Sequence, residues 1–454
     1  MKTKIILLLV SFLLLQTPVI ATNYFVSKSG EDTNLGTENA PFLTITKATD
    51  RVIAGDTVFI KAGTYDERVV LKSSGTQGNR ILIRNYAQDV VIIDGTGITW
   101  WNWNGLFDIS DNKSFITISG LRVINSTFAG FFIDNSHDIS ILNSSTYNTF
   151  SSGIGVWNSE TVVIDHNNVE LACNDGGEES ISIANSSHTI VKNNEVHNNG
   201  AGTVGGEGID VKDGSHDVDV FNNHVHHMNN RIGIYVDAWN HSTANINIYN
   251  NRVHDCKDTG IAVATEMGGP LSNVSIYNNI VYNNKYGGIE VGDWVDDPSV
   301  TVTPVEDIRI INNTLYNNGD GIIVKNADAK QIVVRNNILS KNIGSQLMVE
   351  LTPLAEVLIE KNIIDGCRNN VFELCGSVSM QLDPLFVDPA NKNFKLSSNS
   401  PAIDAGVATQ APLFDFESAL RPINSLWDIG AYEFRSLETN IIPIIFLLLE
   451  DESL

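Results

Sequence analysis

The sequence predicts an all-β fold, a right-handed parallel β-helix with a short N-terminal capping helix, because two phrases recur at short intervals. The second residue of an Asn-Asn phrase recurs at steps of 29, 28, 28, 34 and 24 residues, and a Gly-Ile-x-Val phrase alternates with it. Such a period is typical of a solenoid. Each repeat holds two or three short runs of β-branched residues between Gly or Asn corners. This leaves no room for a helix of about ten residues, so successive coils must pair in parallel.

The recurring asparagines are expected to stack in ladders at a tight corner, where Asn tolerates a left-handed backbone. They are Asn194, Asn223, Asn251, Asn279, Asn313 and Asn337. A second column lies three positions further on and contains His197, His226, His254, Tyr282 and Tyr316. We interpret this column as a structural stack rather than a metal site. A leucine-rich repeat is excluded because its leucine signature is missing, and a propeller blade needs about 40 to 45 residues.

The two ends of the chain differ from the repeats. Met1–Lys4 is basic, Ile5–Leu15 is nearly all apolar, and small residues precede Ala21, as in a secretory signal peptide. The apolar run is too short to span a bilayer comfortably, so we expect a secreted or cell-surface protein. A capping helix is expected around Thr44–Ala54. The predicted division is 1–21 signal peptide, 22–65 N-terminal cap and first coil strand, 66–380 β-helix coils, 381–436 C-terminal capping module, and 437–454 apolar and acidic tail.

The amino-acid composition limits the classes of molecule that the chain is expected to bind. The chain has 53 acidic and 29 basic residues and a net charge of -24, which argues against nucleic acid because phosphate binding needs a basic stripe. We expect that the mature chain does not span a membrane, that it is a monomer, and that its substrate is a polysaccharide. Four cysteines are too few for a disulfide scaffold. Cys367 and Cys375 are close enough in sequence to pair, and Cys173 and Cys256 are expected to be buried small side chains.

Strand alternation predicts which side chains face outward. The Ile and Val of each Gly-Ile-x-Val phrase point inward, so the x position and the residue after Val point out. The first outward column is Gly155, Ser182, Asp210, Tyr235, Ala262, Glu290 and Ile323. The second column is Trp157, Ala184, Lys212, Asp237, Ala264, Gly292 and Lys325, and two places further lie Trp239, Glu266 and Trp294. The same alignment puts Glu179 over Glu207. Acidic and aromatic residues therefore gather on consecutive coils between residues 175 and 294.

This cluster fits β-elimination of a uronate polysaccharide, which is the preferred interpretation. The reaction needs a base for the proton alpha to the carboxylate, and a cation to neutralise that carboxylate. Lys212 is the candidate base, with Arg231 beside it to lower its pKa. Calcium is the candidate cation because it prefers hard oxygen ligands. The candidate ligands are Glu178, Glu179, Glu207 and Asp210.

The strand Gly208–Lys212 resembles the Gly-Phe-Ala-Ala-Lys strand of polysaccharide lyase family nine, a group of calcium-dependent pectate lyases. The resemblance implies that Lys212 is the Brønsted base. Residues 24–65 look like the N-terminal cap of secreted β-helix proteins of the pectate-lyase-like superfamily. Residues 399–406 and 428–434 resemble a C-terminal module of bacterial surface β-helix proteins. One departure is that Gly206-Glu207 replaces the Ala-Asp of the family.

Two other function classes remain open. Asp237 and Glu266 lie on adjacent coils, near the separation of roughly 5 to 5.5 Å that retaining glycoside hydrolases use, and the phrases around them resemble the acid pair of β-helix xylosidases. A non-catalytic β-helix that binds glycans is the third class. In any of the three, side chains suited to sugar contact would line the groove. The candidate substrate-binding residues are Tyr235, Trp239, Glu290, Asp293 and Trp294.

Overall fold

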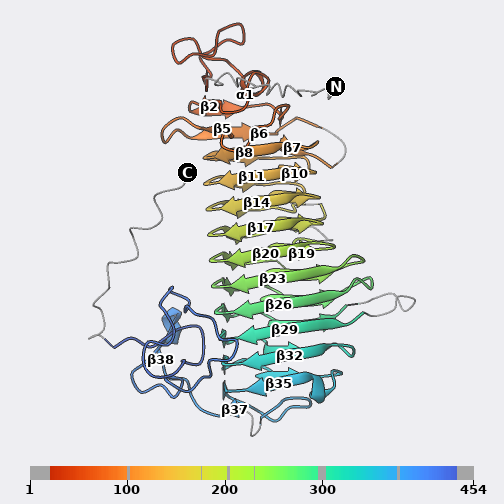
Figure 1. The fold of residues 1–454 in the computed structure, drawn as a ribbon, viewed down its shortest axis with the longest axis vertical. Helices are drawn as coiled ribbons and strands as arrows, with labels where there is room; N and C mark the ends of the chain where they lie inside the picture. The colour runs from red at the N-terminus through yellow and green to blue at the C-terminus, as the bar shows by residue number, and fades with distance from the viewer. Residues whose placement is uncertain are drawn as a thin grey trace, which may run out of the picture.

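The computed structural model describes residues 21–99, 103–174, 176–201, 205–229, 231–294, 303–375 and 379–436. Within these ranges the chain winds through stacked coils along one long axis (Figure 1), and the coils contribute strands to three parallel sheets. This confirms the predicted right-handed parallel β-helix. The predicted signal peptide lies outside the described residues except for Ala21, and the tail 437–454 lies wholly outside them. Secretion therefore stays a prediction.

Sheet 1 begins the coil and carries one strand from each turn. All its neighbouring strands pair in parallel, as coil stacking requires. In the described residues, its strands are, in order, β1 (Asn23–Val26), β2 (Thr57–Ile60), β5 (Ile81–Asn85), β8 (Ser114–Ser119), β11 (His137–Leu142), β14 (Glu160–Asp165), β17 (Ser187–Lys192), β20 (His216–Phe221), β23 (Thr243–Tyr249), β26 (Leu271–Tyr277), β29 (Val305–Ile311), β32 (Lys330–Arg335) and β35 (Val357–Glu360).

Sheet 2 follows sheet 1 across the Asn-Asn corner, and most of its strands are only three residues long. Its described strands are β3 (Gly63–Tyr65), β6 (Val91–Asp94), β9 (Leu121–Ile124), β12 (Ser145–Tyr147), β15 (Asn168–Glu170), β18 (Glu195–His197), β21 (His224–His226), β24 (Arg252–His254), β27 (Ile280–Tyr282), β30 (Thr314–Tyr316), β33 (Ile338–Ser340), β36 (Asn362–Asp365) and β37 (Ser379–Met380).

Sheet 3 contains the Gly-Ile-x-Val phrases and the candidate site. Its described strands are β4 (Val69–Val70), β7 (Gly105–Ile109), β10 (Ala129–Asp134), β13 (Ile154–Trp157), β16 (Ile181–Ala184), β19 (Ile209–Lys212), β22 (Ile234–Ala238), β25 (Ile261–Thr265), β28 (Gly287–Asp293), β31 (Asp320–Val324) and β34 (Leu347–Val349). The Ile and Val of each phrase are fully buried and form part of one continuous core. Burial on this scale is the main favourable contribution to folding.

The Asn-Asn corner divides two roles between its residues. The first asparagine takes the left-handed backbone, with φ of 54° at Asn250 and 54° at Asn278. The second asparagine is buried and forms the ladder. Asn251 donates from Nδ2 to Asn279 Oδ1 at 3.0 Å and to the Val220 carbonyl at 2.9 Å, and its Oδ1 accepts from the backbone N–H of Asn223 at 2.9 Å. Every corner therefore satisfies polar groups that the core would otherwise leave unpaired.

The predicted column of rings is a structural stack over four of its five members. His197 and His226 are 5.0 Å apart between ring centroids, His226 and His254 are 5.2 Å apart, and His254 and Tyr282 are 4.5 Å apart, all nearly parallel. The fifth member, Tyr316, packs instead against phenylalanines near the C-terminus.

The N-terminal cap contains the helix α1 (Ile45–Thr49), shorter than the predicted helix. Thr44 caps it by accepting from the backbone N–H of Lys47 at 3.1 Å, which satisfies a donor that the first turn leaves free. The cap covers the first coil with Phe42 and Ile45, both fully buried.

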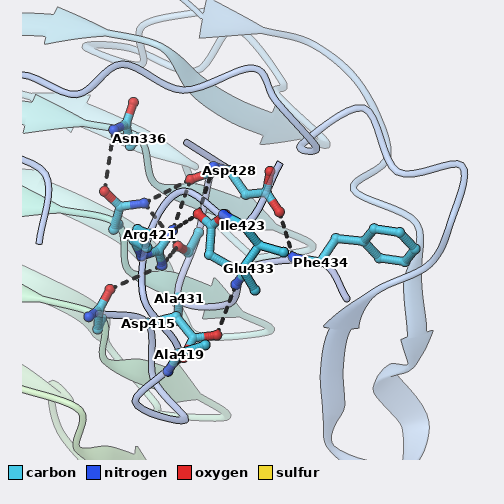
Figure 2. A network of polar contacts seen from close by, with 12 residues as sticks. Asn336, Asp415, Ala419, Arg421, Ile423, Asp428, Ala431, Glu433 and Phe434 are labelled. Atoms are coloured by element: carbon cyan, nitrogen blue, oxygen red, sulfur yellow. Dashed lines mark hydrogen bonds and ion pairs between the residues drawn. The ribbon is translucent and has the colours of Figure 1, made fainter. Parts of the chain in front are cut away.

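The C-terminal residues fold back beside the lower coils, where the blue segment around β38 lies next to the stack in Figure 1. They contain the 3-10 helix η2 (Pro389–Asn391) and the antiparallel pair β38 (Phe386–Asp388) and β39 (Asn393–Leu396); a second 3-10 helix, η1 (Leu354–Glu356), precedes β35. Figure 2 shows the polar network centred on Arg421. Its guanidinium donates to Glu433 Oε1 at 2.6 Å and to Asn278 Oδ1 at 3.2 Å, and both members of the ion pair are fully buried.

The left-handed asparagines of three successive coils bind this C-terminal segment. Asn278 donates to the Phe414 carbonyl, Asn312 to the carbonyls of Asp428 and Gly430, and Asn336 to the Val407 carbonyl.

The cysteines behave as predicted. Cys367 and Cys375 form a disulfide, and Cys173 and Cys256 are free and buried. No helix in the described part of the chain is long and apolar enough to cross a membrane.

Candidate active site

Strand pairing in sheet 3 brings the predicted outward columns into register. Ser182 pairs with Asp210 and Ala184 with Lys212 between β16 and β19, and Asp210 then pairs with Tyr235 on β22. One coil further, Asp237 pairs with Ala264 on β25. Because paired residues lie about 4.8 Å apart across parallel strands, side chains from consecutive coils meet on one face. The predicted register is confirmed.

A cavity of about 580 Å³ lies on this face. Its lining residues are Trp103, Trp157, Glu178, Glu179, Ala184, Gly205, Glu207, Asp210, Lys212, Asp213, Tyr235, Asp237, Trp239 and Glu266. It is smaller than a mostly apolar cavity of about 670 Å³ between sheet 1 and the C-terminal segment, but none of the predicted site residues lines that larger one. The smaller cavity combines charge, titratable groups and aromatic rings, as ligand sites in proteins do. We call it the cleft.

Lys212 lies among carboxylates within the cleft. Its Nζ is 3.0 Å from Glu178 Oε2 and 2.8 Å from Glu179 Oε1, and it lies 5.5 Å from the centre of the Trp157 ring. Burial acts to lower the pKa of Lys212, but the carboxylates of Glu179, Asp210 and Glu178 outweigh it and raise the pKa well above its usual value. Lys212 is therefore a cation at neutral pH.

The expectation that Arg231 lowers the pKa of Lys212 is wrong for this arrangement. Arg231 Nε donates to the Gly205 carbonyl and lies 3.9 Å from Glu207 Oε1, so its charge is directed at the carboxylate of Glu207. Arg231 is not among the residues that line the cleft.

Two more carboxyl groups lie deep in the cleft. Burial, followed by the charge of Glu179, raises the pKa of Glu207 to about 7. Asp210 is 1% exposed, and burial, followed by the charge of Asp237, raises its pKa well above the usual value. Its Oδ1 has no hydrogen-bond partner among the described residues. Close, buried carboxyl groups favour their protonated forms because like charges repel and water is excluded.

Asp237 and Glu266 form the second acidic feature of the cleft. Asp237 is 5% exposed, and burial together with the charge of Glu266 raises its pKa well above the usual value. Glu266 accepts a hydrogen bond at 2.7 Å from the Tyr235 hydroxyl. The two acids differ in environment. Asp237 is buried and its protonated form is favoured, whereas Glu266 accepts a hydrogen bond from Tyr235. Such a difference is how paired carboxyl groups come to act as acid and base.

The structure separates the remaining predicted residues into two groups. Trp239 is 50% exposed and lines the cleft, as expected of a sugar-binding ring. Tyr235 lines it too, but the residue is 4% exposed and its hydroxyl donates a hydrogen bond to Glu266. Trp294 does not line the cleft, because its ring packs 5.1 Å from that of Tyr235. Glu290 and Asp293 also lie outside the lining, and Glu290 accepts a hydrogen bond from Thr259.

Sequence reasoning missed an aromatic wall on the N-terminal side of the cleft. Trp103 is 53% exposed and meets Trp157 edge-on, with ring centroids 4.9 Å apart. The same two rings border a second hollow of about 220 Å³, which Phe132 and Asp134 also line, so the cleft continues toward the earlier coils. The outward position of Trp157 was available from the repeat, whereas Trp103 lies outside any repeated phrase.

The predicted calcium ligands do not form a compact group of three in the described part of the chain. Three sets of His, Cys, Asp or Glu there bring ligand atoms within 4.8 Å of one another, and none includes Glu178, Glu179, Glu207 or Asp210. These oxygens are of the hard type that calcium prefers. Two of the glutamates are, however, engaged with Lys212, so a cation would have to displace its ammonium group. Calcium stays a prediction.

Comparison with known proteins adds the family context. Residues 24–199 match the family model "Pel9A-like, right handed beta helix region", and residues 226–302 match "Right handed beta helix region". Lys212 lies between the two matched ranges, whereas Asp237 and Glu266 lie within the second.

Two curated relatives match over short segments. The uncharacterized protein YwoF of Bacillus subtilis (strain 168) is 38% identical over 99 residues, which is 22% of this chain and 21% of the relative. Pectate lyase PEL9 of Emericella nidulans is 37% identical over 79 residues, or 17% of this chain and 19% of the relative. The chain thus spans about a fifth of the length of each relative that it matches.

Solved structures share the fold at 14% identity. Pectate lyase Pel9A has a TM-score of 0.58, covering 91% of this chain and 96% of that one. XylC in complex with xylose has a TM-score of 0.57, with 91% and 98% covered. The PL6 family alginate lyase AlyGC has a TM-score of 0.52, with 78% and 55% covered. The chain is a right-handed parallel β-helix whose residues 24–199 are similar to the Pel9A-like family model, and it shares this fold with the solved polysaccharide lyases.

Proposed function

We propose that the cleft of this pectate-lyase-like β-helix cleaves a polysaccharide, and that hydrolysis by Asp237 and Glu266 is the chemistry its side chains fit best. The observation that carries this proposal is the contrast between the two acids: Asp237 is buried with a raised pKa, and Glu266 is held by the Tyr235 hydroxyl. A glycosidase needs one carboxyl group that is protonated and a second that is ionised. An extracellular setting belongs to the proposal and is supported by the signal-like residues 1–21.

The proposed mechanism assigns one role to each acid. Asp237 donates its proton to the glycosidic oxygen as the bond from that oxygen to the anomeric carbon breaks, and Glu266 attacks the anomeric carbon to form a glycosyl ester. Asp237 then accepts a proton from water, whose oxygen displaces Glu266 and restores it. Asp237 pairs with Ala264 on β25, and Glu266 follows the end of that strand, two residues after Ala264. This arrangement is compatible with the roughly 5 to 5.5 Å between carboxyl groups that a retaining reaction uses.

The surroundings support the same assignment. Lys212 is a fixed cation whose charge acts to lower the pKa of Asp237 against the effects of burial and of Glu266. It thus limits how strongly Asp237 holds its proton, which a general acid must release. Trp239 and Trp103 offer exposed rings at the cleft, and such rings present apolar faces suited to sugar contact.

The test is a screen of neutral and uronic glycans, with reducing ends and unsaturated products measured in parallel. Asp237→Asn should lower kcat by about 10²- to 10⁴-fold, the usual contribution of general acid catalysis, and Glu266→Gln should lower it at least as much. Glu290→Gln is the matched control, because Glu290 is a half-buried acid of the same sheet that does not line the cleft. Full activity in both Asp237→Asn and Glu266→Gln would refute the assignment.

β-Elimination is the second candidate, because Lys212 lies in the same cleft and a curated relative is a pectate lyase. In this reaction Lys212 would have to lose its proton, which its ion pairs with Glu178 and Glu179 oppose. Calcium held by those glutamates and Glu207 would neutralise the substrate carboxylate and compete for the carboxylates that pair with Lys212.

Product chemistry separates the two reactions. Elimination gives an unsaturated uronate that absorbs near 235 nm, an approximate expectation for its conjugated product, and a chelator and Lys212→Ala should both abolish it. Reducing ends without that absorbance, lost in Asp237→Asn, identify hydrolysis. Glycan retention on an affinity gel without any cleavage would instead identify a binding protein.

A further inference from the structure

A group of metal-binding side chains lies on sheet 2, outside the cleft of sheet 3. Glu195 on β18 and His224 on β21 are paired across adjacent strands, and His226 follows two residues along β21. Val196, which follows Glu195, and Val225, which lies between the two histidines, are fully buried in the core. Because strand side chains alternate, Glu195, His224 and His226 all project from the outer face. The side chains of Glu195 and His224 are 48% and 41% exposed, so an ion in solvent can reach them.

The spacing of their ligand atoms suits one small ion. Glu195 Oε1 lies 3.3 Å from His226 Nε2 and 3.9 Å from His224 Nδ1, and one ligand atom of each residue lies within 4.8 Å of the other two. In a tetrahedral zinc site with bonds of about 2.0 to 2.1 Å, ligand atoms lie about 3.3 Å apart. Small rotations of these side chains are enough to reach that geometry.

The second ring nitrogen of His224 belongs to a hydrogen-bonded chain. His224 Nε2 lies 2.8 Å from His254 Nε2, and His254 Nδ1 lies 2.6 Å from Asp255 Oδ2. An Asp255 carboxylate requires a proton on His254 Nδ1, so a neutral His254 accepts at Nε2 and His224 donates from its own Nε2. The lone pair of His224 Nδ1 then faces Glu195. Metal-binding histidines usually donate their other N–H in this way.

His226 is arranged similarly, since its Nδ1 lies 2.7 Å from His227 Nδ1. If His226 donates there, its Nε2 presents a lone pair to the same point as His224 Nδ1.

Ring stacking does not account for all of these residues. The stack of His197, His226, His254 and Tyr282 explains the positions of the His226 and His254 rings. His224 and Glu195 belong to a different column, whose next member is Arg252. A column that only stacked rings would not need an acid placed 3.3 Å from His226 Nε2 and 3.9 Å from His224 Nδ1.

We propose that Glu195, His224 and His226 bind one divalent transition-metal ion of the zinc class, which ties β18 to β21. Imidazole with one carboxylate suits zinc and its neighbours better than it suits calcium or magnesium. The site lies on a different sheet from Asp237 and Glu266, so it does not depend on the proposed hydrolysis.

The test is calorimetric titration of the full chain, freed of metal with a chelator, with zinc chloride. We expect one zinc ion per chain, a rise in Tm on binding, and at least a tenfold weaker affinity in His224→Asn and in Glu195→Gln. Glu195→Gln removes no ring from the stack, whereas His224 packs 4.3 Å from the His226 ring and 5.0 Å from the His254 ring, so Glu195→Gln is the cleaner of the two variants. His166→Asn is the control, because His166 is 61% exposed at another corner and should leave the affinity unchanged.

Cobalt provides a second readout, because imidazole and carboxylate coordination would give visible absorption bands that are lost in His224→Asn. No zinc binding by the wild-type chain would overturn the proposal. It would also be overturned if His224→Asn and Glu195→Gln bound zinc as tightly as the wild-type chain.

Discussion

Glu207 makes the stability of the protein depend on pH in a direction opposite to that of an ordinary ion-paired acid. Burial and the Glu179 carboxylate raise its pKa from 4.5 to about 7. The folded chain therefore keeps a proton that the unfolded chain releases above pH 4.5, so the free energy of unfolding falls as pH rises from about 4.5 to about 7. One pKa unit corresponds to about 1.4 kcal/mol, so the loss from Glu207 is about 3 kcal/mol.

Glu207→Gln removes this titration while keeping the size of the side chain. Urea unfolding followed by circular dichroism at a series of pH values should show the variant gaining about 3 kcal/mol on the wild-type chain between pH 4.5 and pH 8. Glu170→Gln, on β15 of sheet 2 and away from the cleft, should show no such gain. A wild-type-to-variant difference that stays constant across this range would refute the argument that Glu207 is buried without adequate neutralisation.

Three further changes test other parts of the structure. Arg421→Leu should cost about 3 to 5 kcal/mol of stability by leaving Glu433 buried and unpaired. The double variant Arg421→Leu/Glu433→Leu should lose less stability than the single variant. Equal losses in the two variants, measured by thermal unfolding, would contradict this. Asn251→Ala should lower the free energy of unfolding by at least about 3 kcal/mol, because its ladder partners lose their hydrogen bonds. Asn250→Gly should change it by less than about 1 kcal/mol, because glycine adopts the left-handed backbone of Asn250 readily. If Asp237 is the general acid, kcat should fall as pH rises through its raised pKa, and a pH–rate profile of Asp237→Asn that keeps this fall would exclude that role.

The repeat made most of the fold predictable. The Gly-Ile-x-Val phrase defines both the inward face and the strand register, so the pairing of Asp210 with Tyr235 followed from aligning the phrases. The convergence of Lys212, Glu178 and Glu179 followed in the same way. These predictions succeed because parallel stacking at a constant spacing converts sequence period directly into position.

The repeat period does not predict how deeply an outward side chain is buried, or which charges lie closest to a titratable group. Alternation indicates that Trp294 points outward, but not that it packs on Tyr235 instead of lining the cleft. It places Arg231 near Lys212, but the direction in which the pKa of Lys212 moves depends on its nearest charged neighbours. In the folded chain these are the carboxylates of Glu178 and Glu179, which raise the pKa. Trp103 belongs to no repeated phrase, so only the folded chain reveals it as part of the aromatic wall.

The Asn-Asn corner also determines where the coils are free to differ in length. Sheet 1 and sheet 2 are joined there by two residues in successive turns, as between Tyr277 and Ile280, and the buried ladder does not accommodate an extra residue. The 34-residue step from Asn279 to Asn313 instead places its additional residues between β28 and β29. Insertions are thus diverted to the borders of sheet 3, where they can reshape the rim around the cleft while the scaffold beneath keeps its pitch. Substrate preference can diversify in such a solenoid without a matching loss of foldability.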